Sequence, residues 1–394
     1  MKRTRSPRRA RLSADAEQLV RLAAGLAESG SRLEDVYWDS RLAALIDPLL
    51  AAHDEDALNA ALDQLYHANP QAFNVLADTI ETRCESYLTG KKDEGGATLL
   101  IVAPVLAWSR FSIPSGVLPK EVLANLRTHL QAHVLAQNAK LALADFLFSQ
   151  DQLPTDYSSS AALAGRLAMS ARSGRDLHLD PKQLPQTIQF LSDMRYVLGS
   201  VSVPRGAALF RWQETEETRV DSREQSAKQW RIQAGAALQT TLQGCAFELL
   251  PPQAYYSGCR DADRQARPYS LRAAVTFLQT TLNVSAAALR AVIAPFHEQR
   301  LEEFRIGLIL KEGGEMVHGV VWPLLDAEDE SSDIAPQIEA VLRESGILDI
   351  VMLGQRFPLE YCDDCGAPLY PNPEGEPVHA ELPEQSEAAS RHLH

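Results

Sequence analysis

The sequence predicts an α+β protein, with an all-α N-terminal helical domain followed by a duplicated strand–strand–helix–strand region that ends in a zinc-knuckle-like turn. Three observations predict it. Apolar residues recur at three- and four-residue spacing over residues 13–172, as in amphipathic helices. From residue 196 onward, short apolar runs are bounded by glycine, proline and acidic residues, as strands are. Near the C-terminus two cysteines stand three positions apart, at Cys362 and Cys365.

The helical spacing predicts an all-α domain over residues 13–175. The segments that carry it are residues 17–27, 41–51, 57–66, 73–88 and 122–148. Breaks at Gly30, Pro70 and the Gly95-Gly96 pair leave short connections, which favour antiparallel helical hairpins. The composition turns polar between residues 172 and 185, and we expect the domain boundary there.

The C-terminal half reads as two copies of one α+β module, residues 185–285 and 286–372. The expected strand, strand, helix and strand are residues 196–199, 208–212, 223–242 and 245–250 in copy one, and 304–307, 319–322, 334–344 and 350–353 in copy two. The spacing from glycine to tryptophan is 13 residues in copy one (Gly199 to Trp212) and 15 in copy two (Gly307 to Trp322). This agreement favours a duplication with helices on one face of a mainly antiparallel sheet. The alternative is a chance alignment of two unrelated hairpins.

Charge is unevenly spread over the 394 residues, whose net charge is −14. Residues 1–11 carry six basic side chains and no acid, so the rest of the chain carries −20. We predict a disordered basic arm over residues 1–12 and a polar acidic tail over residues 373–394. The arm, from Lys2 to Arg11, is the segment through which the chain could attract nucleic acid.

The apolar runs and the cysteines predict a cytoplasmic protein with no membrane partner. The longest apolar run, residues 97–108, has twelve residues, whereas a helix needs about 20 to cross a hydrocarbon core. The arm is not followed by the apolar segment of a secretory signal. Five cysteines, an odd number, fit a reducing compartment better than a disulfide framework.

The pair Cys362 and Cys365 predicts half of a structural zinc site. Two thiolates separated by two residues can hold one tetrahedral zinc from a tight turn, and the glycine that follows them suits such a turn. A redox pair of the thioredoxin kind is less favoured, because the flanking aspartates disfavour a thiolate and the following prolines oppose a helix. The expected further ligands are His379 and Cys259, or donors from a second chain in a homodimer. A turn that holds no metal is the remaining alternative.

A second candidate site is the arginine–tyrosine segment after residue 255. Its residues Tyr256, Arg260, Arg264 and Arg267 could hold a phosphate and stack a base, with His318 as a further ligand-binding candidate. The alternative is a solvated helical face whose arginines pair with neighbouring acids.

Residues 249–256, 267–272, 317–323 and 357–362 resemble an uncharacterised bacterial family known only as a domain of unknown function. The resemblance covers most of the chain beyond the arm and implies no activity, cofactor or catalytic residue. The sequence has no phosphate-loop, dinucleotide-binding, nucleophile-elbow or His-Glu-x-x-His motif. We therefore expect a non-enzymatic interaction or adaptor protein with a protein partner. Two alternatives stay open: an enzyme or nucleotide-binding protein that uses the cleft between the copies, and a nucleic-acid-associated protein.

Overall fold

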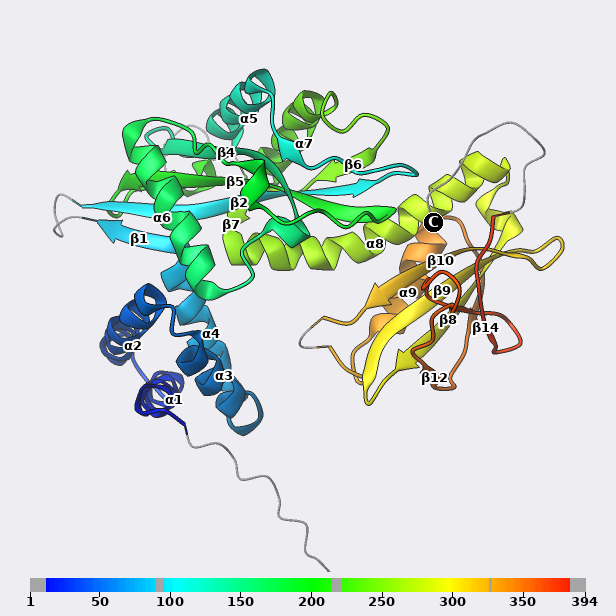
Figure 1. The fold of residues 1–394 in the computed structure, drawn as a ribbon, viewed down its shortest axis with the longest axis horizontal. Helices are drawn as coiled ribbons and strands as arrows, with labels where there is room; N and C mark the ends of the chain where they lie inside the picture. The colour runs from blue at the N-terminus through cyan, green and yellow to red at the C-terminus, as the bar shows by residue number, and fades with distance from the viewer. Residues whose placement is uncertain (1–11, 90–94, 215–221, 326–327, 383–394) are drawn as a thin grey trace, which may run out of the picture.

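The computed structural model describes residues 12–89, 95–214, 222–325 and 328–382, and its architecture is mixed α+β (Figure 1). A helical bundle leads into a large sheet, and one long helix connects that sheet to a smaller one. Residues 1–11 of the predicted arm and 383–394 of the predicted tail lie outside the described residues.

The N-terminal bundle confirms the first part of the helical prediction. It consists of α1 (Ala14–Ala27), α2 (Arg32–Ala52), α3 (Glu55–Ala68) and α4 (Pro70–Glu85). Each helix begins after a residue whose side chain accepts a hydrogen bond from the first turn: Ser13, Ser31, Asp54 and Asn69. Leucines and alanines at helical spacing fill the core between the four helices.

The large sheet is antiparallel throughout its main path. Its strand order is β1 (Ser86–Thr89), β2 (Gly96–Trp108), β5 (Ser192–Pro204), β4 (Lys140–Ser149) and β3 (Gly116–Val117), and β6 (Ala246–Leu249) and β7 (Gln253–Ala254) also pair with β2. Helices α5 (Lys120–His133) and α7 (Arg223–Leu238) pack on one face. Helix α6 (Tyr157–Ser173) and the first half of α8 (Tyr255–Leu282) pack on the other.

The prediction of an all-α domain over residues 13–175 is wrong beyond residue 85. Strands β1, β2, β3 and β4 lie in that range, and the single helix expected at 122–148 is α5 followed by β4. Strands β2 and β4 are buried on both faces along most of their length. Such strands are continuously apolar and lose the alternation that identifies a half-exposed strand, so their spacing can be mistaken for that of a helix.

The small sheet has the strand order β10 (Met316–Pro323), β9 (Leu301–Leu310), β8 (Leu289–His297) and β11 (Asp349–Met352), and β12 (Phe357–Pro358) also pairs with β8. The second half of α8 and helix α9 (Ile334–Glu344) cover one face through an apolar core. The short 3₁₀ helices are η1 (Gln150–Gln152), η2 (Pro181–Gln183), η3 (Arg211–Gln213) and η4 (Ala286–Ala288). In the described parts of the chain, no helix has both the length and the apolar character needed to cross a membrane.

The internal duplication is not confirmed. Copy two has the expected order of β9, β10, α9 and β11, and copy one has its first strand in β5, its helix in α7 and its last strand in β6. Residues 208–212, however, form a single bridge at Phe210 and part of η3 rather than a strand. The cysteines that follow the last expected strand of each copy also differ, because Cys259 lies inside α8 and Cys362 lies in a turn.

Candidate metal centre

The C-terminal segment lies on the open face of the small sheet, opposite α8 and α9. Its strands β13 (Tyr370–Pro371) and β14 (Pro377–Val378) form a short antiparallel hairpin. Two glycines of the sheet permit the close approach. A Cβ atom on Gly307 would lie 2.6 Å from the Pro371 carbonyl oxygen, and one on Gly319 would lie 2.3 Å from the Tyr370 ring. The sheet is therefore shaped to receive this segment.

The turn that carries both cysteines, residues 361–368, is a closed loop. The Gly366 N–H donates to the Cys362 carbonyl oxygen at 2.8 Å, and the Cys362 N–H donates to the Ala367 carbonyl oxygen at 2.8 Å. Gly366 has φ +71°, in the left-handed region that glycine adopts without a steric penalty. We call this loop the knuckle.

Three of the predicted ligands come together at one point. The ligand atoms of Cys362, Cys365 and His379 all lie within 4.8 Å of one another, and Cys365 Sγ is 3.2 Å from His379 Nε2. Donors around a tetrahedral zinc are about 3.5–3.8 Å apart, given Zn–S and Zn–N distances of about 2.3 and 2.0 Å. The geometry and the soft, mixed sulfur and nitrogen donor set therefore suit zinc. Within the described residues this group has three members.

The surroundings of the donors favour metal binding. Backbone hydrogen bonds from Cys365 and Asp364 lower the pKa of the Cys362 thiol below its usual value, against the opposing charge of the Asp364 carboxylate. The carboxylate of Glu381 lies 3.4 Å from His379 Nδ1, within ion-pair distance but not aligned for a hydrogen bond. A carboxylate beside the remote ring nitrogen is common for a metal-bound histidine, and it leaves Nε2 facing the sulfurs.

The remaining metal candidate, Cys259, does not join this group. It lies in α8 against the large sheet, where burial, together with the Asp263 charge, raises the pKa of its thiol to about 12. A buried, neutral thiol on a helix is a poor metal ligand.

The arginines of the second candidate site are each beside an acid. Arg260 contacts Glu81 of α4 at 2.6 Å, and Arg264 lies 3.9 Å from Asp261. Arg267 is buried and forms a 2.6 Å ion pair with Glu328. Burial works to raise the pKa of Glu328, but the hydrogen bond from Arg267 lowers it below its usual value. These charges are therefore largely neutralised within the fold.

The other two ligand-binding candidates, His318 and Tyr256, pack against aromatic rings. The His318 ring meets Phe277 of α8 edge-on at 5.9 Å, and burial lowers the pKa of His318 to about 4. Tyr256 is the second residue of α8 and packs against Tyr255 and Tyr157. The candidates do not converge on one cleft between the two sheets.

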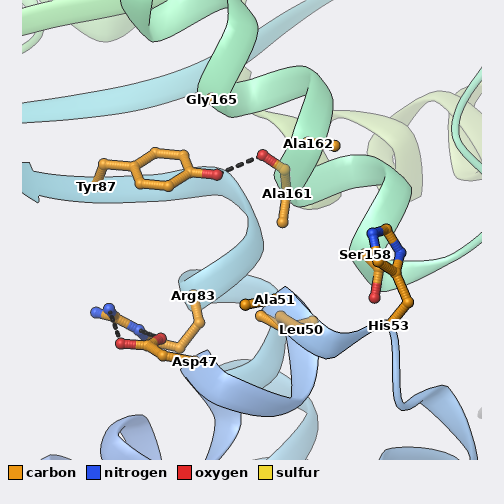
Figure 2. Close-up of a pocket in the computed structure, with 10 residues that line it drawn as sticks. All are labelled: Asp47, Leu50, Ala51, His53, Arg83, Tyr87, Ser158, Ala161, Ala162 and Gly165. Atoms are coloured by element: carbon orange, nitrogen blue, oxygen red, sulfur yellow. Dashed lines mark hydrogen bonds and ion pairs between the residues drawn. The ribbon is translucent and has the colours of Figure 1, made fainter.

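Two cavities lie instead where the bundle meets α6 and α8. The first has a volume of about 420 Å³ and is lined by apolar residues and by Asp47, Arg83, Tyr87 and Ser158 (Figure 2). The second, of about 390 Å³, is lined by Tyr256 and polar residues of α3 and α6. Neither is lined by Cys362, Cys365 or His379. Sequence reasoning missed these cavities because they arise where separate elements pack.

The structure thus defines a mixed α+β protein with a C-terminal Cys₂His group that could hold a metal. The family described as "Protein of unknown function (DUF2863)" matches residues 4–393, nearly the whole chain, and the chain belongs to it. No curated protein matches the sequence. No solved structure matches it either.

Proposed function

We propose that this chain is a non-enzymatic interaction protein whose C-terminal knuckle is fixed by one zinc ion bound to Cys362, Cys365 and His379. The observation that carries the proposal is the convergence of three donors from two separate segments of the chain, with 14 residues from Cys365 to His379. Zinc between the knuckle and the β13–β14 hairpin would cross-link two segments that have little apolar core of their own.

A structural role is favoured over a catalytic one by where the donors lie. A catalytic zinc keeps an open position that faces a substrate cavity. Here the three donors lie close together at the surface of the small sheet, and none of them lines either of the two cavities at the bundle. The enzyme or phosphate-ligand alternative needs unpaired cations, whereas Arg260 and Arg267 contact carboxylates. A thermal-shift panel of nucleotides and phosphorylated metabolites tests that alternative, because saturation at 100 times Kd stabilises by about 2.7 kcal/mol.

The protein partner would bind the first turns of α2. Leu33, Val36 and Tyr37 lie on one helical face and are exposed, Leu33 to 85%. Since residues 12–394 carry −20, we propose a partner that presents an apolar surface with basic flanks. Cross-linking of the tagged protein in its source cells should yield a complex that Leu33→Glu abolishes. The matched control Leu348→Glu, at a second exposed leucine, should retain it. Equal yields from both variants would contradict this surface.

The cytoplasm is the compartment that we propose, since zinc thiolates require reduced cysteines. The described cysteines Cys84, Cys245, Cys259, Cys362 and Cys365 are all free thiols.

The zinc proposal is tested by matched substitutions on protein purified without a chelator or a histidine tag. Cys365→Ser and His379→Asn should lose bound zinc and lower the melting temperature. Cys245→Ser and His178→Asn change a half-buried cysteine and an exposed histidine elsewhere. They should keep the zinc content and the melting temperature of the wild type. Equal zinc content in all four variants would refute the site. Half a zinc per wild-type chain would indicate a site shared across a homodimer.

A further inference from the structure

A buried arginine lies directly beneath the knuckle. Arg305, on β9, has no exposed surface. Its Nη1 donates to the carbonyl oxygens of Glu360 at 2.5 Å and Leu369 at 2.8 Å. These two residues flank the knuckle, and the Leu369 N–H donates to the Glu360 carbonyl at 3.2 Å. One guanidinium therefore holds both ends of the loop together.

The guanidinium is itself fixed on several sides. Its Nε donates to Glu303 Oε1 at 2.6 Å, which neutralises the buried charge. The ring of Phe296 lies 4.3 Å from it, and the ring of Tyr361, next to Cys362, lies 5.0 Å from it. Arginine suits this place because its planar group donates in several directions and stacks on rings at the same time, which lysine cannot do.

We propose that Arg305 is a positioning residue that pre-forms the knuckle, so that metal binds a loop that is already folded. The metal in this inference rests on the proposed function. The shape of the loop does not rest on it. Many small zinc modules are unfolded without metal, and their apparent affinity is reduced by the cost of ordering the loop. Here that ordering would be provided by the sheet. The signal in the sequence was a charged residue within an apolar strand, between Phe304 and Ile306.

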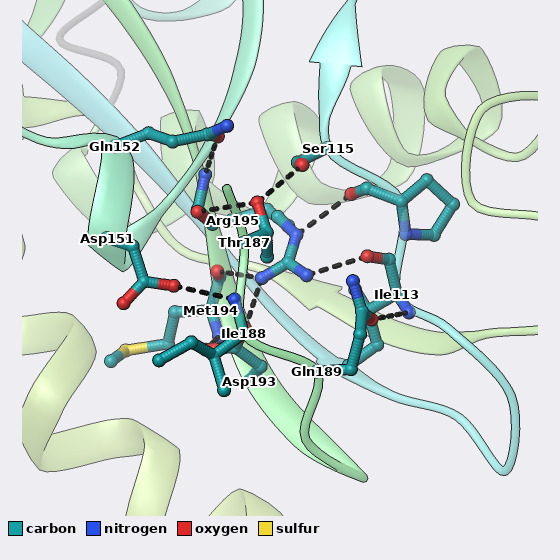
Figure 3. Close-up of polar contacts among 12 residues, drawn as sticks. Ile113, Ser115, Asp151, Gln152, Thr187, Ile188, Gln189, Asp193, Met194 and Arg195 are labelled. Atoms are coloured by element: carbon teal, nitrogen blue, oxygen red, sulfur yellow. Dashed lines mark hydrogen bonds and ion pairs between the residues drawn. The ribbon is translucent and has the colours of Figure 1, made fainter. Parts of the chain in front are cut away.

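The large sheet contains a close counterpart that serves as a control. Arg195 on β5 is equally buried and forms an ion pair with Asp193, two residues earlier, as Arg305 does with Glu303 (Figure 3). Its guanidinium donates to the carbonyl oxygens of Pro114 at 2.8 Å and Ile113 at 2.7 Å. That loop carries no metal donor, so its loss should affect stability but not metal affinity.

The test measures the zinc Kd by competition with a chromophoric chelator in full-length protein. Arg305→Met should raise the Kd at least tenfold. Arg305→Lys should give an intermediate value, because an ammonium keeps the charge and reaches a carbonyl but does not stack. Arg195→Met should lower the melting temperature by a similar amount and leave the Kd within twofold of wild type. A Kd for Arg305→Met within threefold of wild type, or an equal rise for Arg195→Met, would overturn the proposal.

A second measurement on the wild-type chain applies even if these variants fail to fold. After zinc is removed with a chelator, amide hydrogen exchange is followed at Cys362 and Gly366, whose N–H groups close the knuckle. Protection that persists without zinc supports a pre-formed loop, and exchange at the rate of a free chain would overturn it. A wild-type protein that never binds zinc would refute the proposed function, and the exchange result would still decide whether the loop is pre-formed.

Discussion

Gly319→Ala tests whether the packing of the C-terminal segment on the small sheet builds the metal site. A Cβ at this position would lie 2.3 Å from three atoms of the Tyr370 ring, more than 1 Å inside ordinary contact. Tyr370 is mostly buried, and burial raises the pKa of its hydroxyl to about 12. The rigid ring must therefore move away from the sheet, and overpacking of this kind costs about 1–3 kcal/mol.

The displaced strand β13 pairs with β14, and His379 follows β14 directly. If docking of the hairpin is weakened by about 2 kcal/mol, the zinc Kd should rise roughly thirtyfold, since each 1.4 kcal/mol is a factor of ten. Chelator competition measures the Kd, and urea unfolding measures the stability. The control is Gly354→Ala, where an added Cβ meets nothing within 4 Å. An unchanged zinc Kd in Gly319→Ala, with its stability lowered, would refute the link between packing and metal binding.

Three further predictions concern other parts of the chain. Burial raises the pKa of Glu85 to about 7, above the ~4.3 of an unfolded chain, so its contribution to stability is lost as pH rises through this window. Glu85→Gln keeps an acceptor for the Tyr256 N–H but carries no charge. Its free energy of unfolding should therefore exceed that of the wild type by about 2–3 kcal/mol more at pH 8 than at pH 5, and the same difference from wild type at both pH values would contradict this. Arg267→Met should cost about 2–3 kcal/mol in urea unfolding, less than the ~3–5 of a fully buried pair because the Glu328 side chain is 21% exposed; a loss below about 0.5 kcal/mol would show that the pair is not stabilising. Deletion of residues 2–11 should abolish any salt-sensitive binding of nucleic acid in a filter assay, and retained binding would exclude the arm.

Local signals in the sequence were sufficient for part of the fold. The bundle followed from apolar spacing, and capping residues such as Ser31 and Asp54 are a further local signal, because their effect extends over one turn. Helix α9 begins and ends where its spacing predicted, at Ile334 and Glu344, because only one of its faces is buried. Strand β2 was not recognised, because it is buried on both faces and its alternation is absent.

The candidate site shows the same division between local and long-range information. The spacing of Cys362 and Cys365 and the proximity in sequence of His379 predicted the group that the structure brings together. Cys259 was included on the assumption of a duplication, and the helix that contains it separates it from the knuckle. Arg305 reaches the knuckle across 55 and 64 residues, and such contacts depend on tertiary packing that no short motif encodes.

A zinc ion held by two sulfurs and one imidazole can be detected by zinc-edge X-ray absorption on the purified chain, combined with its metal content by mass spectrometry. We expect about one zinc per chain, with two sulfur neighbours at about 2.3 Å and a histidine nitrogen at about 2.0 Å. Absence of zinc from protein purified without chelators, or a shell that contains only oxygen and nitrogen, would contradict it.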